Sequence, residues 1–281
     1  MMWMKLQYLG TAAAEGVPAL FCTCDNCRRS REAGGRHIRT RSQAIIDDRL
    51  LIDFPADTYM HYLTYHFPLP TIKDCLVTHA HSDHLYPAEI HMREKWFASL
   101  PADTPPLTFH GDVAVCDAIN RIKAEVGMQD DRVVARQIPL FTPFEVDGYT
   151  VTALRATHDP QSSPVVYLIS NGDKTLFYSN DTGEYPAESM AYLENLPRPL
   201  DLISLDCTSA CSHSTYPNHF SLERCETVRQ QLLDCGAADA HTQFVLNHFS
   251  HDGEGVVYDD FVPVAAAKGF QVAYDGMVIA V

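Results

Sequence analysis

The sequence predicts an α/β fold in two halves, and three observations support this prediction. Short apolar runs, typical of buried strands, alternate with longer segments of helical periodicity along the 281 residues. Polar residues rich in His and Asp follow several of these runs, at the points where the strands end. No linker or low-complexity tract divides the chain, so we expect a single domain over residues 1–281.

Composition limits the possible classes of function. Hydrophobic residues make up 46% of the chain, enough for a sizeable core. The net charge of −15 argues against a long nucleic-acid partner, because backbone binding needs clustered Lys and Arg. No apolar run approaches the length of a membrane span, and residues 1–10 lack the features of a signal peptide. With 9 cysteines and no secretion signal, we expect reduced thiols or metal ligands in a cytoplasmic protein.

The predicted elements follow one another in a regular order. In the first half we expect strands over residues 5–9, 42–48, 50–54, 75–77, 107–110, 138–146 and 149–154, and helices over 56–65, 87–100 and 112–126. In the second half we expect a β-hairpin over 165–178, strands over 201–205 and 243–246, a helix capped by Ser221, and a hairpin over 270–281 around Asp275-Gly276.

The segment from His79 to His84 carries the strongest chemical signal. It reads His-Ala-His-Ser-Asp-His and follows the apolar run over 75–77. In an extended backbone, His79 and His81 face the same side, while Asp83 and His84 turn toward a neighbouring point. Two nitrogen ligands beside a nitrogen–carboxylate pair suit two adjacent ions of the Zn, Mn or Fe type. A polar loop rich in His by chance is the weaker interpretation of so dense a cluster.

Two other places in the chain suggest metal chemistry. Cys22, Cys24 and Cys27 can reach one ion, but a tetrahedral site must then take its fourth ligand from elsewhere. Reduced cysteines without a function are the alternative. Asp53, at a strand end, is either a hydrogen-bond partner for a metal-bound His or a turn carboxylate, and the sequence leaves both open. The basic stretch over 28–31 is more typical of a solvated helix face than of a binding patch.

The His-x-His-x-Asp-His motif after an apolar strand resembles the signature of the metallo-β-lactamase superfamily. The resemblance implies a four-layer αββα sandwich, two divalent metal ions in a catalytic site, and further ligands that each follow a strand. Candidate residues occur in the expected order over nearly the whole chain. The implied ligands are His79, His81 and His158 for one ion, Asp83, His84 and His248 for the other, and Asp181 as the bridge between them.

The N-terminal segment narrows the resemblance. Residues 9–18 and the Cys-x-Cys-x-x-Cys stretch resemble the cyclic phosphodiesterase of the C–P lyase pathway, and also the protein associated with pyrroloquinoline quinone biosynthesis. The phosphodiesterase group implies a structural zinc in an N-terminal loop at residues 21–28. Its implied ligands are Cys22, Cys24, Cys27 and His251. The pair Asn218-His219 resembles a catalytic Asn-His pair of that group, which assigns His219 to catalysis together with Asp83.

The resemblance implies a metal-dependent phosphodiesterase that cleaves a small cyclic or diester phosphate through hydroxide bound to two metals. Zn or Mn are the expected catalytic metals, with Fe as a further option. Two alternatives stay open: a hydrolase of the same fold acting on a carboxylic ester, thioester or lactam, and a non-catalytic accessory protein like the quinone-biosynthesis relative. We expect a small phosphate-containing substrate as partner, no long nucleic acid and no membrane, and we leave a homodimer open.

One stretch departs from the superfamily pattern. Many members continue with a Gly-rich segment after the motif, whereas this chain has Leu85-Tyr86-Pro87. We therefore expect a different pocket wall here and different substrate contacts from the helix that follows it. The candidate contacts for a substrate phosphate or its surroundings are Arg39, Arg41, Ser42, Arg93, Lys95 and Trp96.

Overall fold

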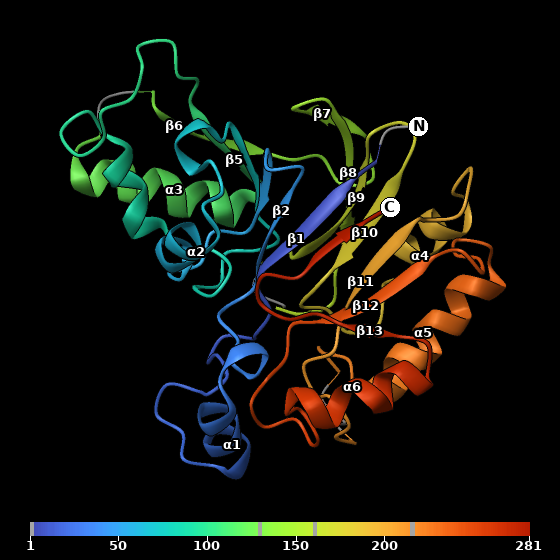
Figure 1. The fold of residues 1–281 in the computed structure, drawn as a ribbon. Coiled ribbons are helices and arrows are strands. Elements are labelled where there is room, and N and C mark those ends of the chain that lie inside the picture. The colour runs from blue at the N-terminus through green and yellow to red at the C-terminus, as the bar shows by residue number, and fades with distance from the viewer. Residues whose placement is uncertain (1–2, 129–130, 160–161, 214–216) are drawn as a thin grey trace.

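The computed structural model describes residues 3–128, 131–159, 162–213 and 217–281. Within these ranges two seven-stranded sheets pack face to face, and helices cover their outer faces, which is the metallo-β-lactamase sandwich that the sequence predicts (Figure 1). The helices α2 (Thr58–Tyr65) and α3 (Val113–Val126) lie beside the first sheet. The second sheet is covered by α4 (Ala187–Glu194), α5 (Leu222–Asp234) and α6 (Tyr258–Ala267).

Each sheet mixes parallel and antiparallel neighbours. The strands of the first sheet, in spatial order, are β14 (Val278–Ala280), β1 (Lys5–Gly10), β2 (Gln43–Ile46), β3 (Leu50–Ile52), β4 (Asp74–Leu76), β5 (Leu107–Gly111) and β6 (Val133–Gln137). Those of the second are β13 (Gln271–Val272), β12 (Gln243–Asn247), β11 (Leu202–Asp206), β10 (Thr175–Ser179), β9 (Val165–Ser170), β8 (Tyr149–Arg155) and β7 (Phe144–Val146).

Three apolar clusters account for the layering. Buried side chains of both sheets, such as Tyr8 and Tyr178, fill the space between them. A second cluster joins the first sheet to α3, and a third joins the second sheet to its helices. The two longest helices begin at the caps their sequences indicate, because the side chains of Asp112 and Ser221 accept hydrogen bonds from the backbone N–H of Val115 and Arg224.

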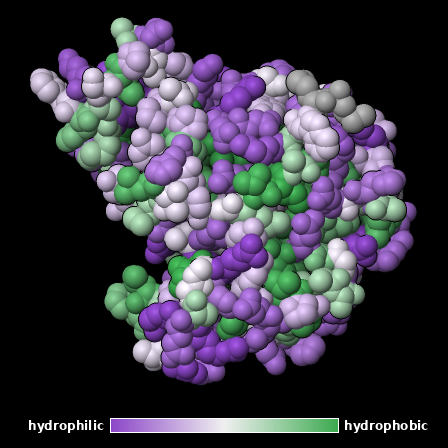
Figure 2. All heavy atoms as spheres, viewed as in Figure 1, coloured by the Kyte–Doolittle hydropathy of each residue, from purple (hydrophilic) through white to green (hydrophobic). Residues whose placement is uncertain are grey.

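The helix α1 (Asp25–Ala33) belongs to a lobe outside the sandwich. This lobe projects at the lower left of Figure 1, and Figure 2 shows a notch between it and the rest of the molecule on the same side. Arg28 on α1 pairs with Asp25 and Glu32, which agrees with a solvated helix face. The ion pair between Arg29 and Asp260 links α1 to α6.

Two predicted elements are shorter or placed differently in the structure. The helix expected over 87–100 is a 3₁₀ helix, η3, that ends at Arg93. The strand expected over 138–146 is wrong: β6 ends at Gln137 and β7 begins at Phe144. Pro139 and Pro143 explain this difference, since neither residue has the N–H that a strand ladder requires.

The predicted C-terminal hairpin is also wrong. β13 pairs in parallel with β12 of the second sheet, whereas β14 pairs antiparallel with β1 of the first. The chain does turn at Asp275-Gly276, but the turn carries it from one sheet to the other. Its geometry is fixed by the hydrogen bond from the Gly276 N–H to the Tyr8 carbonyl, at 2.7 Å. No helix of the described residues combines the length and apolarity needed to cross a membrane.

Candidate metal centre

The seven expected catalytic ligands lie at one end of the sandwich, each in the segment that follows a strand. The motif from His79 to His84 follows β4, while His158, Asp181 and His248 follow β8, β10 and β12. The structure brings them into two groups of four whose ligand atoms all lie within 4.8 Å of one another. The groups are His79, His81, His158 and Asp181, and Asp83, His84, His248 and again Asp181.

Asp181 is the centre of this arrangement. Its Oδ2 lies 3.2 Å from Nε2 of His79 and 3.1 Å from Nε2 of His84, and its Oδ1 lies 3.1 Å from Nδ1 of His158. Although burial raises its pKa, the surrounding histidines, His248 first among them, hold the pKa of Asp181 well below its usual value. The carboxylate therefore stays ionised between the two groups, where the expected bridging ligand belongs.

The donor set fits divalent metal ions. Nε2 of His79, Nδ1 of His158 and Oδ1 of Asp181 are buried and make no hydrogen bond to the described residues, although they lie close together. Nε2 of His158 also approaches a ring nitrogen of His81, at 3.1 Å. Buried polar atoms are normally paired, so a cluster of unpaired nitrogen and carboxylate atoms facing one centre is the arrangement that a bound cation satisfies. That these residues bind metal nevertheless stays a prediction.

Asp53 takes the first of the two roles that the sequence left open. Its Oδ2 lies 2.8 Å from Nδ1 of His84, and its Oδ1 accepts hydrogen bonds from the N–H and hydroxyl of Thr78. The contact directs the other ring nitrogen of His84 toward Asp83 and Asp181. In addition, the charge of His84 outweighs the effect of burial on Asp83 and lowers the pKa of that carboxyl.

Asp206 is a functional candidate that the sequence analysis missed. It ends β11 and is fully buried, and its Oδ1 accepts hydrogen bonds from the backbone N–H groups of Thr208 and Phe220. Its Oδ2 lies 3.2 Å from Nδ1 of His219 and 3.4 Å from Nδ1 of His248. One carboxylate thus orients an expected ligand and an expected catalytic histidine, and its position at a strand end beside the others was the available signal.

The backbone near this centre is strained in a way common at functional sites. Asp53, Asp181 and His248 have φ values of 64°, 55° and 62°, which non-glycine residues seldom adopt. Each of them lies within two residues of the end of a strand and has its side chain at or beside the centre. Such conformations persist only where surrounding contacts enforce them, and they cluster at active sites.

His219 lies at the edge of the centre, where Nδ1 contacts both Asp206 and Asp181. Burial by itself lowers the pKa of the ring, but the charges of Asp206 and Asp181 and the hydrogen bond to Asp206 raise it to about 9. The two carboxylates thus favour the protonated form of the ring. The ring can therefore donate a hydrogen bond or a proton to a group bound over the centre.

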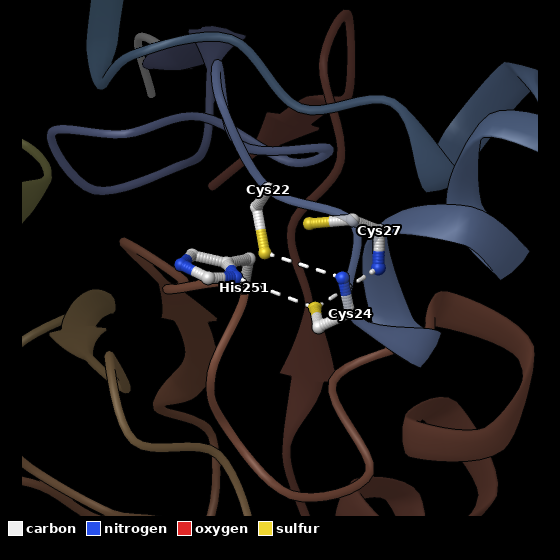
Figure 3. A group of neighbouring side chains, drawn as sticks. All are labelled: Cys22, Cys24, Cys27 and His251. Atoms are coloured by element: carbon white, nitrogen blue, oxygen red, sulfur yellow. Dashed lines mark hydrogen bonds between the residues drawn. The ribbon is translucent and has the colours of Figure 1, made fainter.

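The second predicted cluster joins two distant parts of the chain. The thiols of Cys22, Cys24 and Cys27 face His251, and their ligand atoms lie within 4.8 Å of one another (Figure 3). Sγ of Cys24 lies 3.5 Å from Nδ1 of His251. Burial raises the pKa of the Cys27 thiol to about 12. The arrangement matches the four ligands that the resemblance implies, and zinc binding there stays a prediction.

The expected substrate contacts on the arginines are not supported. Arg39 is 2% exposed, and its guanidinium lies 4.2 Å from the ring centre of Phe249 and donates to the carbonyl of Ala273. Arg41 pairs with Asp57. Arg93 donates to backbone carbonyls that include those of Pro70 and Pro105. All three stabilise loops, a role that long-range folding imposes and local sequence does not show.

The remaining candidates also lie elsewhere. Ser42 is buried and contacts Tyr178 and Asn180, while Lys95 packs against the exposed ring of Trp96. The segment Leu85-Tyr86-Pro87, which we expected in the pocket wall, does not line the cavity above the metal centre. That cavity has a volume of about 610 Å³, and His81, Asp83, His158, Asp181, His219 and His248 all reach it.

Comparison with known proteins identifies the family. A model described as the Beta-lactamase superfamily domain matches residues 49–249, so the chain belongs to the β-lactamase superfamily. The superfamily and the fold indicate a metal-dependent hydrolase with divalent metal ions. No curated protein matches the sequence significantly.

Solved structures share the fold at low sequence identity. A diphosphatase from the PhnP family is 20% identical, with a TM-score of 0.74 over 100% of this chain and 98% of that one. Zn²⁺-bound PqqB from Methylobacterium extorquens is also 20% identical, with a TM-score of 0.73 over 98% and 99%. The short form of human tRNase Z is 17% identical, with a TM-score of 0.68 over 98% of both chains. At these identities the likeness concerns the fold.

Proposed function

We propose that the protein is a dinuclear metal-dependent phosphodiesterase that cleaves a small cyclic or diester phosphate. The observation that carries the proposal is the double cluster centred on Asp181, with His219 held against Asp206 at its edge. Neighbours of the same fold include a diphosphatase and a tRNase, and both names refer to phosphate chemistry. The same set of residues also suits hydrolysis of other acyl or phosphoryl bonds, so the substrate class needs a direct test.

The two groups of ligands would hold two divalent ions, which supply ionised water at neutral pH and neutralise charge on phosphoryl oxygens. The chain itself contributes the position of these groups. Asp53 and Asp206 fix the rings of His84 and His248 through Nδ1, which leaves Nε2 of each ring directed at the centre. The burial of both rings excludes competing water from the ligands.

His219 supplies the acid of the proposed reaction. Asp206 holds its Nδ1 side at 3.2 Å and favours the protonated form of the ring, and the ring lines the cavity above the centre. From there it donates a hydrogen bond to a phosphoryl oxygen or a proton to the leaving alkoxide. Thr208, whose hydroxyl donates to Asp206 at 2.9 Å, completes this support.

We further propose that Cys22, Cys24, Cys27 and His251 hold a structural zinc. Three thiols and one imidazole form a closed tetrahedral donor set, which is typical of structural rather than catalytic zinc. The site would join the lobe of α1 to the segment that follows His248. An assignment of the protein to the C–P lyase phosphodiesterase group rests on this site and on the motif resemblance.

The test is hydrolysis of bis(p-nitrophenyl) phosphate by protein loaded with Mn²⁺ or Zn²⁺. We expect turnover by the native protein and a loss of about 10³-fold or more in the Asp181→Ala variant, because the shared ligand disappears. Elemental analysis should show fewer bound ions in the same variant. Asp234→Ala is the matched control, since Asp234 is exposed on α5 and its carboxylate contacts only Gln230 among the interactions described.

Two outcomes would contradict the proposal. Fully loaded protein that leaves the diester intact but cleaves a p-nitrophenyl carboxylic ester would favour the other hydrolase chemistry. Activity that survives in Asp181→Ala would show that the double cluster is not the reaction centre. Competition by inorganic phosphate separates these cases further, since a phosphodiesterase site should bind phosphate and be inhibited by it.

A further inference from the structure

The cavity above the metal centre has two chemically different sides. One side consists of the expected ligands and His219. The other part of the lining comes from two loops that are far apart in sequence, one containing Glu15 and the other containing Ser250 and Asp252. We refer to the side chains of Glu15, Ser250 and Asp252 as the acidic wall.

Two carboxylates of the acidic wall converge on one hydroxyl. Oγ of Ser250 is within hydrogen-bond distance of Oε1 of Glu15 and lies 2.5 Å from Oδ1 of Asp252. A hydroxyl has a single proton, so it can donate to only one of the two carboxylates. The backbone N–H of His251 adds one long hydrogen bond to Glu15, at 3.3 Å. The wall therefore offers several carboxylate lone pairs to whatever occupies the cavity.

No Lys or Arg side chain in the described cavity lining offsets these carboxylates. None of the described residues that line the cavity is Lys or Arg, and the residues outside the described ranges include neither type. Arg41 lies close to the cavity, since its Nε donates to the carbonyl of Ala14, which lines the cavity. Its Nη1, however, donates to Asp57. Beside the acidic wall, only His251 among the described residues could add positive charge, since its Nε2 lies 4.0 Å from Oε1 of Glu15, and any other positive charge would come from the metal side.

The acidic wall is held firmly in place. The N–H of Ala13 donates to the carbonyl of Phe249, and the N–H of Phe249 donates to the carbonyl of Thr11, each at 2.9 Å. On the other side, Nδ2 of Asn26 donates to the carbonyl of His251 at 3.0 Å. A wall fixed by backbone hydrogen bonds can discriminate between substrates, because it does not swing away from a poorly matched group.

We propose that the acidic wall selects the part of the substrate that lies beyond the reacting phosphate: it accepts an uncharged group bearing hydroxyls and rejects a group with a second negative charge. The inference rests on the proposed phosphodiesterase function and deepens it. Carboxylates commonly bind sugar hydroxyls, as in the recognition of ribose by dinucleotide-binding folds. The carboxylate oxygens of Glu15 and Asp252 can accept hydrogen bonds from the hydroxyls of such a group, and Ser209 adds a further hydroxyl to the same cavity.

The experiment uses three diesters that share a p-nitrophenyl phosphate and differ in the second ester group: propyl, 2,3-dihydroxypropyl and 2-carboxyethyl. Release of p-nitrophenolate reports all three reactions. In metal-loaded native protein we expect kcat/KM to be about tenfold higher for the dihydroxypropyl diester than for the propyl diester, and about tenfold lower for the carboxyethyl diester. The difference in kcat/KM between the propyl and carboxyethyl diesters should shrink as salt is added, because salt screens the repulsion between carboxylates.

The variants Glu15→Gln and Asp252→Asn identify the source of the selectivity. Each removes one charge at nearly constant shape, so we expect the ratio of kcat/KM for the propyl diester to that for the carboxyethyl diester to fall about three- to tenfold in each variant. Glu145→Gln, an exposed carboxylate on β7 outside the cavity lining, should retain the native ratios. Equal ratios in native protein and both variants would overturn the proposal.

Binding gives a second readout that does not require turnover. Propyl phosphate, glycerol phosphate and 2-carboxyethyl phosphate are the corresponding products, and calorimetric titration should rank their affinities as the diesters are ranked. A preference for a 2-aminoethyl group over the dihydroxypropyl group would overturn the hydroxyl assignment, because it would show recognition by charge. If no diester is hydrolysed, the phosphodiesterase function fails. If all three are hydrolysed equally well, the phosphodiesterase function stands and only the proposed selectivity of the acidic wall is wrong.

Discussion

The two candidate metal clusters differ in what holds their ligands. In the catalytic cluster, His79, His84, His248 and Asp181 are almost fully buried, and carboxylates outside the ligand set fix the rings of His84 and His248. In the cysteine cluster, Cys24 is exposed, and the thiols accept only weak hydrogen bonds from nearby N–H groups, such as that of Cys27 to Cys24 at 3.5 Å. One cluster is organised by the protein, whereas the other would be organised by its metal.

This difference separates two uses of a metal. A reaction centre needs ligands in place before the substrate arrives, and the fold supplies them from the ends of strands in both sheets. A structural ion can instead contribute its binding free energy to folding, because it adds a further link between segments that are far apart in sequence. Here it would tie the lobe of α1 to the loop that carries the acidic wall.

Among the residues outside the ligand set, the largest effect on catalysis is expected at Asp206. The Asp206→Asn variant keeps the size of the side chain but loses the charge that faces His219 and His248. We expect kcat/KM for bis(p-nitrophenyl) phosphate to fall about 10²- to 10³-fold, while the fold is retained. Asp201→Asn, at the opposite end of the same strand, is the control, since Asp201 accepts hydrogen bonds from Lys174 and Thr175 away from the centre. Equal activities of the two variants would contradict the role of Asp206.

A smaller effect, on metal affinity, is expected when Asp53 is replaced. Replacement by Asn weakens the contact that orients His84, so we expect the affinity for the catalytic metals to drop about 10- to 100-fold. Competition with a fluorescent zinc chelator measures this affinity. Asp74→Asn offers a matched control, because Asp74 holds His110 at 2.7 Å in a similar pair away from any cluster. Unchanged metal affinity in Asp53→Asn would show that His84 is oriented without it.

Loss of a ligand from the cysteine cluster should lower stability and leave catalysis nearly unchanged. In Cys24→Ser we expect the loss of one zinc per chain and a fall in Tm of roughly 5 °C, with diester hydrolysis within about threefold of native. Elemental analysis and thermal unfolding at constant protein concentration are the measurements. Cys116→Ser, a thiol on α3 outside the cluster, should keep both the metal content and Tm. A native zinc content in Cys24→Ser would show that the cysteine cluster does not hold a structural zinc.

The contrast also shows what sequence can predict. The seven expected ligands were placed by the resemblance to the superfamily motif, and the sequence supports this placement because each lies near the end of an apolar run. The role of Asp206 could not be assigned, since its two histidine partners depend on how β11 and β12 align. The C-terminal strands were misjudged for a related reason: the Asp275-Gly276 turn is a local signal, whereas the pairing of Lys5 with Ala280 is long-range. Arg39 and Arg41 likewise looked available until the tertiary contacts were known.

The last prediction concerns the loop that connects the two clusters and should affect stability alone. Asp275 accepts hydrogen bonds from Thr11 and Thr40 at 2.6 Å. Thr11 in turn accepts a hydrogen bond from the N–H of Phe249, which belongs to this loop. Burial raises its pKa to about 6, against about 3.9 in the unfolded chain. The folded state therefore binds a proton more tightly, so this group favours folding below about pH 4 and loses that contribution as the pH rises to about 6.

Across this window, the free energy of unfolding should fall by up to roughly 3 kcal/mol on account of Asp275. Urea unfolding between pH 4 and 7.5 measures the slope, and Asp275→Asn should lack this component even if its overall stability is lower. The exposed Asp234→Asn variant should keep the native slope. Parallel curves for native protein and Asp275→Asn would mean that the buried carboxylate is already ionised at low pH. In that case the hydrogen bonds from Thr11 and Thr40 and the charge of Arg39, which lower the pKa of Asp275, would outweigh the effect of burial.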